Sequence, residues 1–502
     1  MNKKIIYAAP SSSSPYHLDT INNLKSKYNW EPVIINSPSS IVDLARKKFP
    51  EAWVSDSMKI RQAQFDNIVK KDLVPLETDL INNVKKFETK YFLTLEDASG
   101  WDYSFEERKE NFYDIIKYWN SIIKKFQPNI FIGFNWPHVS SDYSLYLLSK
   151  YYYKLPTIFI NPIPLFNKSY YSFGTSLENS SETFIKDYNS NESDKTSFIV
   201  KEYLKNFDKN PSEPIYQNKY YNRLRTKKNY SFFQLIYFLF TGKIFKKLNL
   251  AIKKNKTIAK SEKSRISILD HIFLINKKKK LNKKNIFFYE KNSVKFIDDE
   301  NYIYYPAQYF PEPNSGIMLN TYQDQFLILE MLNKALPNNW KIYYKEHPET
   351  FLSLRLSSPF KNEEYFKKLK KLDKIILISQ KVNSLKLIKS AKATVGLGTA
   401  GWESLILGKP CLIFDNIWYS ACKSVIKIKS INDIKNAIKK INNNYSVDPN
   451  DIKKYAQSVY LSSFETSIYS DTLEYLKVDK IQIKKNYLKL ADEFVKFYNK
   501  FF

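Results

Sequence analysis

The sequence predicts an α/β protein with two Rossmann-like domains that face a cleft, separated by a basic helical insertion and followed by C-terminal helices. Three observations carry this prediction. Strand and helix patterns alternate in the first third of the chain, the alternation resumes near residue 300, and a lysine-rich stretch lies between the two parts. Such alternation predicts parallel sheets with crossover helices, and a length of 502 residues accommodates two such domains.

The first third begins with a short apolar run after Lys3 and Lys4. We interpret this run as a strand, because it is too short to form the core of an export signal. Apolar residues at helical spacing follow it, and then comes the run Val33-Ile34-Ile35. In chain order we expect a strand at 4–8, a helix at 17–28, and strands at 30–36 and 129–133, then a helix at 143–153 and a strand at 157–160.

The second series follows the lysine-rich stretch and shows the same alternation. The expected strands lie at 302–305, 340–345, 375–378, 393–395, 411–414 and 424–428. The expected helices lie at 324–335, 363–372, 384–391, 400–407 and 431–441, with another amphipathic helix at 487–501. We therefore divide the chain into 1–200, the basic insertion 201–295, 296–450, and C-terminal helices at 451–502 that pack back on the body.

Charge is concentrated in the basic insertion. The net charge is 79 − 51 = +28, and residues 219–284 hold twenty Lys or Arg against Glu262 and Asp270, so they carry 20 − 2 = +18 of it. Basic residues around the apolar run 232–240 are typical of a segment that lies on an anionic membrane surface. A lysine-rich helical hairpin packed on the body is the other interpretation. No nucleic-acid motif accompanies the charge, so we expect no nucleic-acid partner.

The cysteines and apolar runs indicate the compartment. Cys411 and Cys422 cannot build a disulfide framework, and the four histidines stand at no metal-ligand spacing from them. We therefore expect no metal, no cofactor and a reducing compartment. No stretch approaches the ~20 apolar residues that a bilayer-spanning helix needs. The expected location is the cytoplasm, with peripheral attachment to the inner membrane if the basic segment binds it.

Glycine is scarce, with 9 in the chain, yet Gly396, Gly398 and Gly401 fall in one strand-to-helix turn. We expect Thr399 to be the N-cap of the helix, so that main-chain N–H groups at Gly398 and Ala400 face a phosphate. The spacing matches neither a P-loop nor a full dinucleotide fingerprint. A tight turn that binds nothing is the alternative.

Two residues of the following helix belong to the same motif. Glu403 lies in its first turns and is a further candidate for nucleotide binding. Gly408 is expected to end the helix as a C-cap and is therefore excluded from the ligand site.

A second motif stands at the end of the strand 340–345. Pro348 stops the strand and holds His347 at its carboxyl end, where ligands of open α/β sheets bind. Lys345 and His347 would share one face if the strand continued that far. Together they could bind a phosphate and stabilise a charged leaving group, which makes His347 a catalytic candidate. A structural histidine is the alternative.

A proline-rich loop after the strand 302–305 supplies two more candidates. Gln308 and Glu312 could hydrogen-bond a base or a ribose, or the loop could be a structural linker.

The first domain supplies its own pair after the strand 129–133. His138 and Asp142 are the residue types that usually act as a general base. Capping of the next helix by Ser141 or Asp142 is the alternative.

Taken together, these motifs resemble those of the capsule polysaccharide biosynthesis family, which includes the retaining β-Kdo transferases of bacterial capsule assembly. The resemblance covers about residues 302–414 and rests on segments 308–312, 324–325, 336–337, 345–348, 398–403 and 408–410. His347 resembles the histidine of the family's His-Pro motif, which contacts the donor phosphate. The chain departs from the family where two residues separate Gln308 from Pro311, and where Asp415 replaces a glycine.

The resemblance implies a GT-B-like fold and a glycosyltransferase of surface or capsular polysaccharide biosynthesis. Residues 1–200 would bind the acceptor and 296–450 a nucleotide sugar, which is CMP-linked in the Kdo enzymes. The acceptor would be a lipid-linked saccharide or a polysaccharide. Two alternatives stay open: a CDP-glycerol-type polyol-phosphate transferase, and a non-catalytic polysaccharide assembly or export protein with the same fold.

Overall fold

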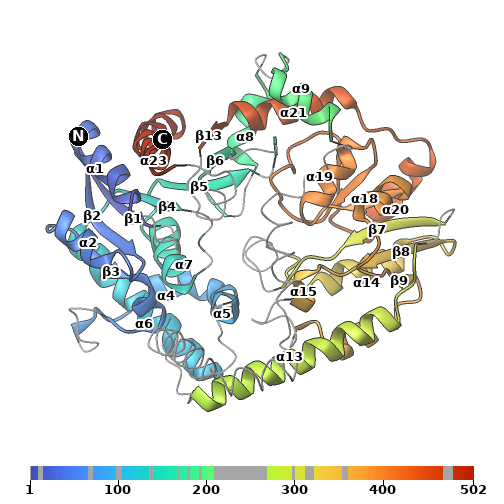
Figure 1. The fold of residues 1–502 in the computed structure, drawn as a ribbon, viewed down its shortest axis with the longest axis horizontal. Coiled ribbons are helices and arrows are strands. Elements are labelled where there is room, and N and C mark those ends of the chain that lie inside the picture. The colour runs from blue at the N-terminus through green and yellow to red at the C-terminus, as the bar shows by residue number, and fades with distance from the viewer. Residues whose placement is uncertain are drawn as a thin grey trace, which may run out of the picture.

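The computed structural model describes residues 2–9, 15–65, 72–97, 104–134, 137, 139–163, 165–166, 170–177, 181–190, 195–207, 268–296, 300–310, 321–352, 360–466 and 479–502. Their strands form two separate sheets that lie side by side and are accompanied by helices (Figure 1). The predicted α/β fold class, GT-B-like with two Rossmann-like domains, is confirmed by the topology of these sheets.

The first sheet is largely parallel. Its strands are β1 (Lys3–Ala8), β2 (Trp30–Ser37), β3 (Trp53–Asp56), β4 (Ile130–Phe134), β5 (Thr157–Ile163), β6 (Tyr170–Gly174) and β13 (Ser463–Glu465). They lie in the order β13-β6-β5-β4-β1-β2-β3, with antiparallel pairing only at β6. The parallel part has the strand order of a Rossmann fold, which reverses between β1 and β4.

Helices bury both faces of this sheet. They are α1 (His17–Tyr28), α2 (Val42–Lys48), α3 (Ser57–Arg61), α4 (Thr78–Val84), α5 (Glu88–Asp97), α6 (Phe105–Phe126), α7 (Ser140–Leu147) and α23 (Lys480–Phe501). Ile5 and Ile132 belong to a core shared with α1 and α23, whereas Ile6 and Phe131 face α6 and α7. This split follows from the period of two along a strand.

The second sheet is parallel throughout. Its strands are β7 (Asn301–Pro306), β8 (Trp340–Lys345), β9 (Ile375–Leu377), β10 (Ala393–Val395), β11 (Cys411–Ile413) and β12 (Val425–Lys427). They lie in the order β12-β11-β10-β7-β8-β9, which is the Rossmann order with its reversal between β7 and β10. The helices of this domain are α13 (Ile268–Lys291), α14 (Gln325–Ala335), α15 (Glu349–Leu352), α17 (Glu363–Leu369), α18 (Ser384–Ser390), α19 (Thr399–Ile406) and α20 (Ile431–Asn442).

A buried apolar cluster joins the two domains. It lies among α8 (Glu182–Tyr188), α9 (Phe198–Lys205), α19 and α21 (Pro449–Leu461). Phe184 and Tyr203 from the first part of the chain belong to the same cluster as Trp402 and Tyr455. After α21 the chain returns to the first sheet, where β13 pairs with β6 and α23 packs on α1 (Figure 1).

The predicted elements are confirmed where their patterns were strong. The helix expected at 17–28 and the strands expected at 340–345 and 393–395 have the predicted ends as α1, β8 and β10. Several elements were not predicted, among them β3, α6 and β13. The helix expected at 143–153 begins earlier, as α7, and ends in a π-helical turn at Leu148–Tyr152.

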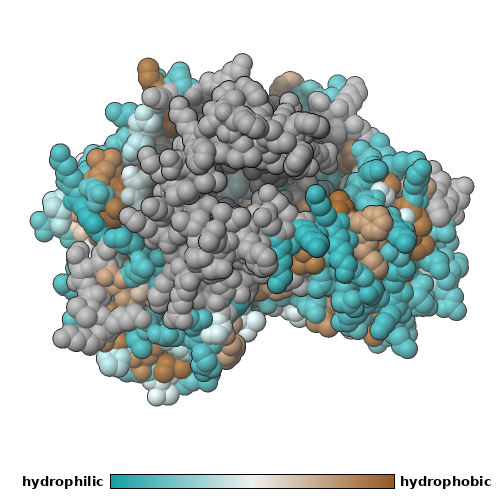
Figure 2. All heavy atoms as spheres, turned by 60° about the horizontal axis from the view of Figure 1, so that its bottom comes forward, coloured by the Kyte–Doolittle hydropathy of each residue, from teal (hydrophilic) through white to brown (hydrophobic). Residues whose placement is uncertain are grey.

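Most of the basic segment 219–284 lies outside the described residues, which resume at 268 with α13. Within the described part of the chain, none of the helices combines the length and apolar character that crossing a bilayer requires. The described atoms of the face shown in Figure 2 are mostly hydrophilic, with apolar residues scattered among them.

Candidate functional site

Three loops meet at the carboxyl edge of the second sheet. Gln308 follows β7, His347 follows β8 and the turn at Gly398 follows β10, and these three strands are neighbours. Gln308 and Gly398 flank the reversal point between β7 and β10, which is where open α/β sheets bind ligands. They are also in contact, because a Cβ built on Gly398 would lie 2.8 Å from both terminal atoms of the Gln308 amide.

The other two glycines of the turn have a packing role. A Cβ on Gly401 would lie 2.1 Å from the Tyr419 hydroxyl and 2.7 Å from the Gly396 Cα. A Cβ on Gly396 would lie 2.7 Å from the Cys411 sulfur. These two positions therefore need glycine so that α19 can pack closely on the end of the sheet. Of the three, Gly398 is the one that faces Gln308.

The cap of α19 differs from the prediction. Gly398 is the N-cap residue and forms no side-chain cap hydrogen bond, and Thr399 is the first helical residue and is exposed. The first N–H groups, including that of Ala400, thus receive no acceptor from a side chain at the cap position. Glu403 lies one turn further on, where its carboxylate adds to the effect of burial in raising the pKa of Tyr304. The C-cap of α19 is Leu407 and not the predicted Gly408; Gly408, at φ 71°, is the residue that follows the cap in the left-handed conformation.

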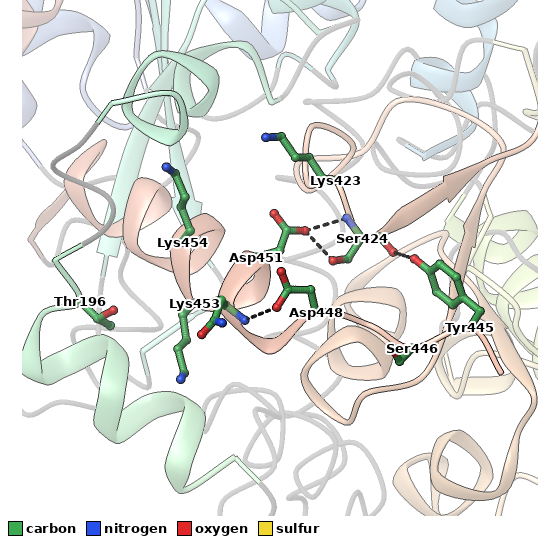
Figure 3. Close-up of a pocket in the computed structure, with 10 residues that line it drawn as sticks. Thr196, Lys423, Ser424, Tyr445, Ser446, Asp448, Asp451, Lys453 and Lys454 are labelled. Atoms are coloured by element: carbon green, nitrogen blue, oxygen red, sulfur yellow. Dashed lines mark hydrogen bonds between the residues drawn. The ribbon is translucent and has the colours of Figure 1, made fainter.

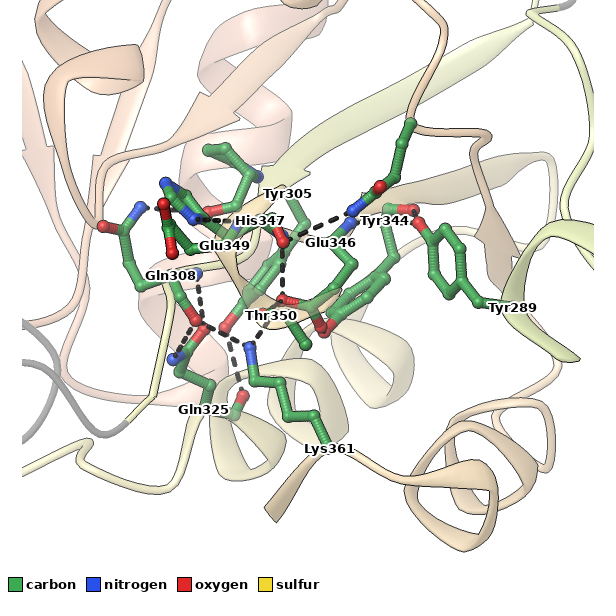
Figure 4. Close-up of polar contacts among 12 residues, drawn as sticks. Tyr289, Tyr305, Gln308, Gln325, Tyr344, Glu346, His347, Glu349, Thr350 and Lys361 are labelled. Carbon is green, nitrogen blue, oxygen red and sulfur yellow. Dashed lines mark hydrogen bonds and ion pairs between the residues drawn. The ribbon is translucent and has the colours of Figure 1, made fainter. Parts of the chain in front are cut away.

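A buried ion pair supports the loops after β7 and β8 (Figure 4). The Lys361 ammonium lies 2.9 Å from Glu346 Oε1, with side-chain exposures of 4% and 0%. Glu346 Oε1 also accepts the main-chain N–H of His347 at 2.8 Å and the hydroxyl of Thr350 at 2.9 Å. Lys361 donates in addition to the main-chain carbonyl of Gln308 at 2.6 Å. One buried pair therefore fixes the backbone of both Gln308 and His347.

Gln325 is a second residue that fixes the loop after β7. It is the first residue of α14 and is buried. Its Oε1 accepts the main-chain N–H of Gln308 at 3.0 Å, and its Nε2 donates to the Gln308 carbonyl at 3.2 Å (Figure 4). The side-chain amide of Gln325 thus bonds both the N–H and the carbonyl of Gln308, as the main chain of a neighbouring strand would. These two hydrogen bonds fix the direction in which the loop after β7 leaves the sheet.

His347 is a neutral hydrogen-bond donor at pH 7. Its Nδ1 accepts the main-chain N–H of Glu349 at 3.2 Å, so the ring proton is on Nε2. Burial, followed by the charges of Lys361 and Lys345, lowers the pKa of His347 to about 3. The imidazole can therefore donate one hydrogen bond to an anion, but it does not contribute a positive charge at neutral pH.

Lys345 occupies a different position from the one expected. β8 ends at Lys345, so the strand does not continue to His347 and the two residues do not share a strand face. The Lys345 ammonium donates to the carbonyl of Val382 at 2.6 Å and to the hydroxyl of Ser384 at 2.9 Å. Its charge still acts on His347, because it contributes to the lowered pKa of the imidazole.

Asp142 lies near the carboxyl edge of the first sheet. It is in the first turn of α7, whose N-cap is Val139, and neither Ser141 nor Asp142 caps this helix. Its Oδ1 accepts from the buried Asn36 amide at 2.5 Å, and Asn36 belongs to β2. The other two candidates, His138 and Glu312, lie outside the described residues.

Glu346, Lys361 and Gln325 hold the loops after β7 and β8 in place, and none of these three roles was predicted from the sequence. The position of Glu346 beside His347 was a usable signal, because a carboxylate directly after a buried strand must find partners. No sequence pattern marks Lys361 as a partner of Glu346, because the chain contains many lysines and Lys361 lies in a loop after α15. Among the described residues, no group of His, Cys, Asp or Glu is arranged to hold a metal ion.

The sequence matches no protein-family model and no curated protein. Among solved structures, the chain is similar to KpsC, a β-Kdo 2,7 transferase of Thermosulfurimonas dismutans. The two sequences are 12% identical, the match covers 76% of this chain and 95% of that chain, and the TM-score is 0.31. A UDP-GlcNAc 2-epimerase of Methanocaldococcus jannaschii covers 90% of this chain and 98% of its own, at 14% identity and a TM-score of 0.24. A glycosyltransferase of Rickettsia africae covers 99% of both chains, at 12% identity and a TM-score of 0.26.

Proposed function

We propose that the chain is a glycosyltransferase of surface or capsular polysaccharide biosynthesis that uses a nucleotide sugar, with a CMP-linked sugar as donor. The observation that carries the proposal is the contact of Gln308 with the Gly398 turn at the reversal point of a Rossmann-type sheet, with His347 at the end of the neighbouring strand β8. The motif resemblance over residues 302–414 supplies the substrate class.

In this proposal the donor phosphate lies between His347 and the start of α19. The Nε2–H of His347 donates to one phosphate oxygen, and the N–H groups of Thr399 and Ala400 donate to others. Lys345 contributes positive potential at longer range, because its ammonium is held by Val382 and Ser384. Gln308, Glu312 and Glu403 remain candidates for binding the nucleoside.

The reaction needs a group that takes a proton from the acceptor. The bond between the anomeric carbon and the phosphate oxygen breaks, and its electron pair leaves on the phosphate. The acceptor oxygen bonds to the same carbon and loses its proton to a carboxylate or imidazole of the first domain. We assign this role to Asp142, which Asn36 orients, and retain His138 as the second candidate.

A donor screen tests the proposal. The purified chain is incubated with CMP-Kdo, CDP-glycerol and UDP-GlcNAc, with and without a saccharide acceptor, and nucleotide release is measured. We expect CMP release from CMP-Kdo and its loss in His347→Ala. Turnover of CDP-glycerol without turnover of the CMP-sugar would favour the polyol-phosphate transferase. Absence of thermal stabilisation by CMP, CDP or UDP would favour the non-catalytic alternative.

The basic segment 219–284 is proposed to hold the cytoplasmic enzyme near a lipid-linked acceptor at the inner membrane. Its +18 charge and central apolar run support this. Binding to vesicles that contain an anionic lipid should weaken with salt and disappear when the segment is deleted. Equal binding by the deletion variant would refute membrane attachment through this segment.

A further inference from the structure

Lysines lie in two kinds of surroundings in the described part of the chain. In the cavity of Figure 3, Asp448 and Asp451 lie among three lysines, so charges of both signs line it. The helix α13, which runs along one edge of the molecule (Figure 1), separates its charges instead. Wherever its side chains are described, the exposed ones are Lys277, Lys280, Lys283, Lys284, Phe287 and Lys291.

These six residues share one face of α13. At about 100° per residue they fall within an arc of about 120°, and the buried residues Asn282, Asn285 and Tyr289 lie on the opposite side of the helix. Phe287 is 69% exposed. Lysines stand three or four positions from it on both sides, which makes them its neighbours on the helix surface. An exposed aromatic ring therefore lies within a row of ammonium groups.

The carboxylates nearest in the chain or in space leave this face positive. Glu363 of α17 pairs with Lys284 at 2.9 Å. Glu290 is directed inward, where its carboxylate accepts from the Ser379 hydroxyl at 2.6 Å. The other four lysines of the face form no ion pair with a carboxylate of the described ranges. The face thus carries a surplus of positive charge.

The opposite side of α13 is bonded to the candidate donor site. The Tyr289 hydroxyl accepts the main-chain N–H of Glu346 at 2.9 Å and donates to the Ile378 carbonyl at 2.7 Å. Glu346 in turn fixes the main chain of His347. A partner that binds the exposed face is therefore held at a defined position relative to the loop after β8.

From this arrangement we infer that the exposed face of α13, from Lys277 to Lys291, binds an anionic membrane surface. The lysines lie against anionic headgroups, and Phe287 enters the interfacial layer between them. A membrane is favoured over a soluble polyanion because the convex face of one helix encloses no ligand, whereas a planar partner contacts the whole row and covers the aromatic ring. The inference rests on the proposed function for the identity of the membrane, and it assigns the proposed attachment to a particular surface.

The test measures cosedimentation of the full chain with vesicles of phosphatidylcholine, with and without phosphatidylglycerol. We expect binding only to the anionic vesicles, and we expect salt to weaken it. Lys280→Ala/Lys283→Ala should lose about tenfold or more in affinity, because each lysine near an anionic surface contributes to binding. The matched control is Lys439→Ala/Lys440→Ala, which removes the same charge from exposed positions of α20 and should bind like the parent protein.

A second measurement locates the contact at Phe287. Brominated lipid in the anionic vesicles should quench the added fluorescence of the Phe287→Trp variant. The matched control is Phe198→Trp on α9, because Phe198 is 76% exposed and lies on a different element. The added fluorescence of that control should not be quenched.

Unchanged vesicle binding by Lys280→Ala/Lys283→Ala, an equal loss in the α20 control, or equal quenching at the two aromatic positions would overturn the assignment to α13. So would binding of soluble polygalacturonate as tight as that of the vesicles, lost in the same lysine variant, because the face would then bind a soluble polyanion. His347→Ala separates this inference from the proposed function. It should bind vesicles like the parent protein, and failure of the donor screen would leave the vesicle result unaffected.

Discussion

The ammonium of Lys361 donates to the main-chain carbonyl of Gln308 at 2.6 Å while it pairs with the buried carboxylate of Glu346. A charge from the loop after α15 therefore fixes the loop after β7, and through Glu346 it also fixes the main chain of His347. Two candidate ligand-binding residues from different strands depend on this one ion pair.

Replacement of Lys361 should destabilise the second domain strongly. In Lys361→Met, Glu346 keeps a buried charge without its cation, and loss of one partner of a buried pair typically costs about 3–5 kcal/mol. The free energy of unfolding in urea measures this. The double variant Glu346→Gln/Lys361→Met should recover part of the loss, because it removes the unpaired charge. A double variant whose loss equals the sum of the two single losses would show that the pair is not coupled.

The two glycines Gly398 and Gly401 should respond differently to alanine. Gly401→Ala places a Cβ against the Tyr419 hydroxyl and the Gly396 backbone, so we expect a loss of about 1–3 kcal/mol in unfolding free energy. Gly398→Ala meets only the end of the Gln308 side chain, which can move. It should leave stability within about 1 kcal/mol of the parent and weaken nucleotide binding. Equal stability losses in the two variants would contradict the assignment of separate packing and binding roles.

The pH dependence of donor turnover should show no ionisation of His347 near its ordinary pKa. Because burial and two nearby lysines lower that pKa to about 3, the imidazole stays a neutral donor across pH 5 to 8. Turnover is measured across that range for the parent protein and for His347→Gln, which retains a side-chain donor. An inflection near pH 6.5 that disappears in His347→Gln would contradict the neutral donor.

His17 should make folding stability sensitive to acid. It is fully buried on Tyr7, neither ring nitrogen has a partner among the described residues, and burial lowers its pKa to about 3. Between that value and the unfolded pKa of about 6.5 the unfolded state binds the proton, so stability falls as pH falls through this window. His17→Phe removes this contribution. Its unfolding free energy should drop less between pH 7 and 5 than that of the parent, and an equal drop would refute the prediction.

Asp142 should be required for transfer and dispensable for folding. Asp142→Asn removes the proton acceptor but keeps the shape of the side chain, so we expect turnover to fall by about 10²- to 10⁴-fold with a small change in melting temperature. Asn36→Ala should lower turnover by less, because it only removes the hydrogen bond that orients the carboxylate. Full activity in Asp142→Asn would move the role to His138.

The fold was predictable where local patterns agree with the final packing. β8 and β10 are short buried runs bounded by turn residues, and α1 has a clear helical period, so their positions followed from the sequence. β13 was not predictable, because three residues become a strand only through pairing with β6, which is about 290 positions earlier in the chain.

The candidate site was predictable in part. Gln308, His347 and Gly398 were selected as candidates because each follows a strand pattern, and strand ends are where a parallel sheet binds ligands. The packing role of Gly396 and Gly401 depends on Tyr419 and Cys411, which the turn sequence does not reveal. The neutral state of His347 likewise depends on burial and on Lys361, a residue from a separate loop.

The most direct test of the central claim is a calorimetric titration of CMP into the parent protein and into His347→Gln and His347→Ala. If the phosphate binds at the carboxyl edge of the second sheet, the parent protein binds CMP, the alanine variant loses about tenfold or more in affinity, and the glutamine variant retains part of it. Equal CMP affinity in all three proteins, or no binding of CMP, CDP or UDP by the parent protein, would contradict the nucleotide-sugar site.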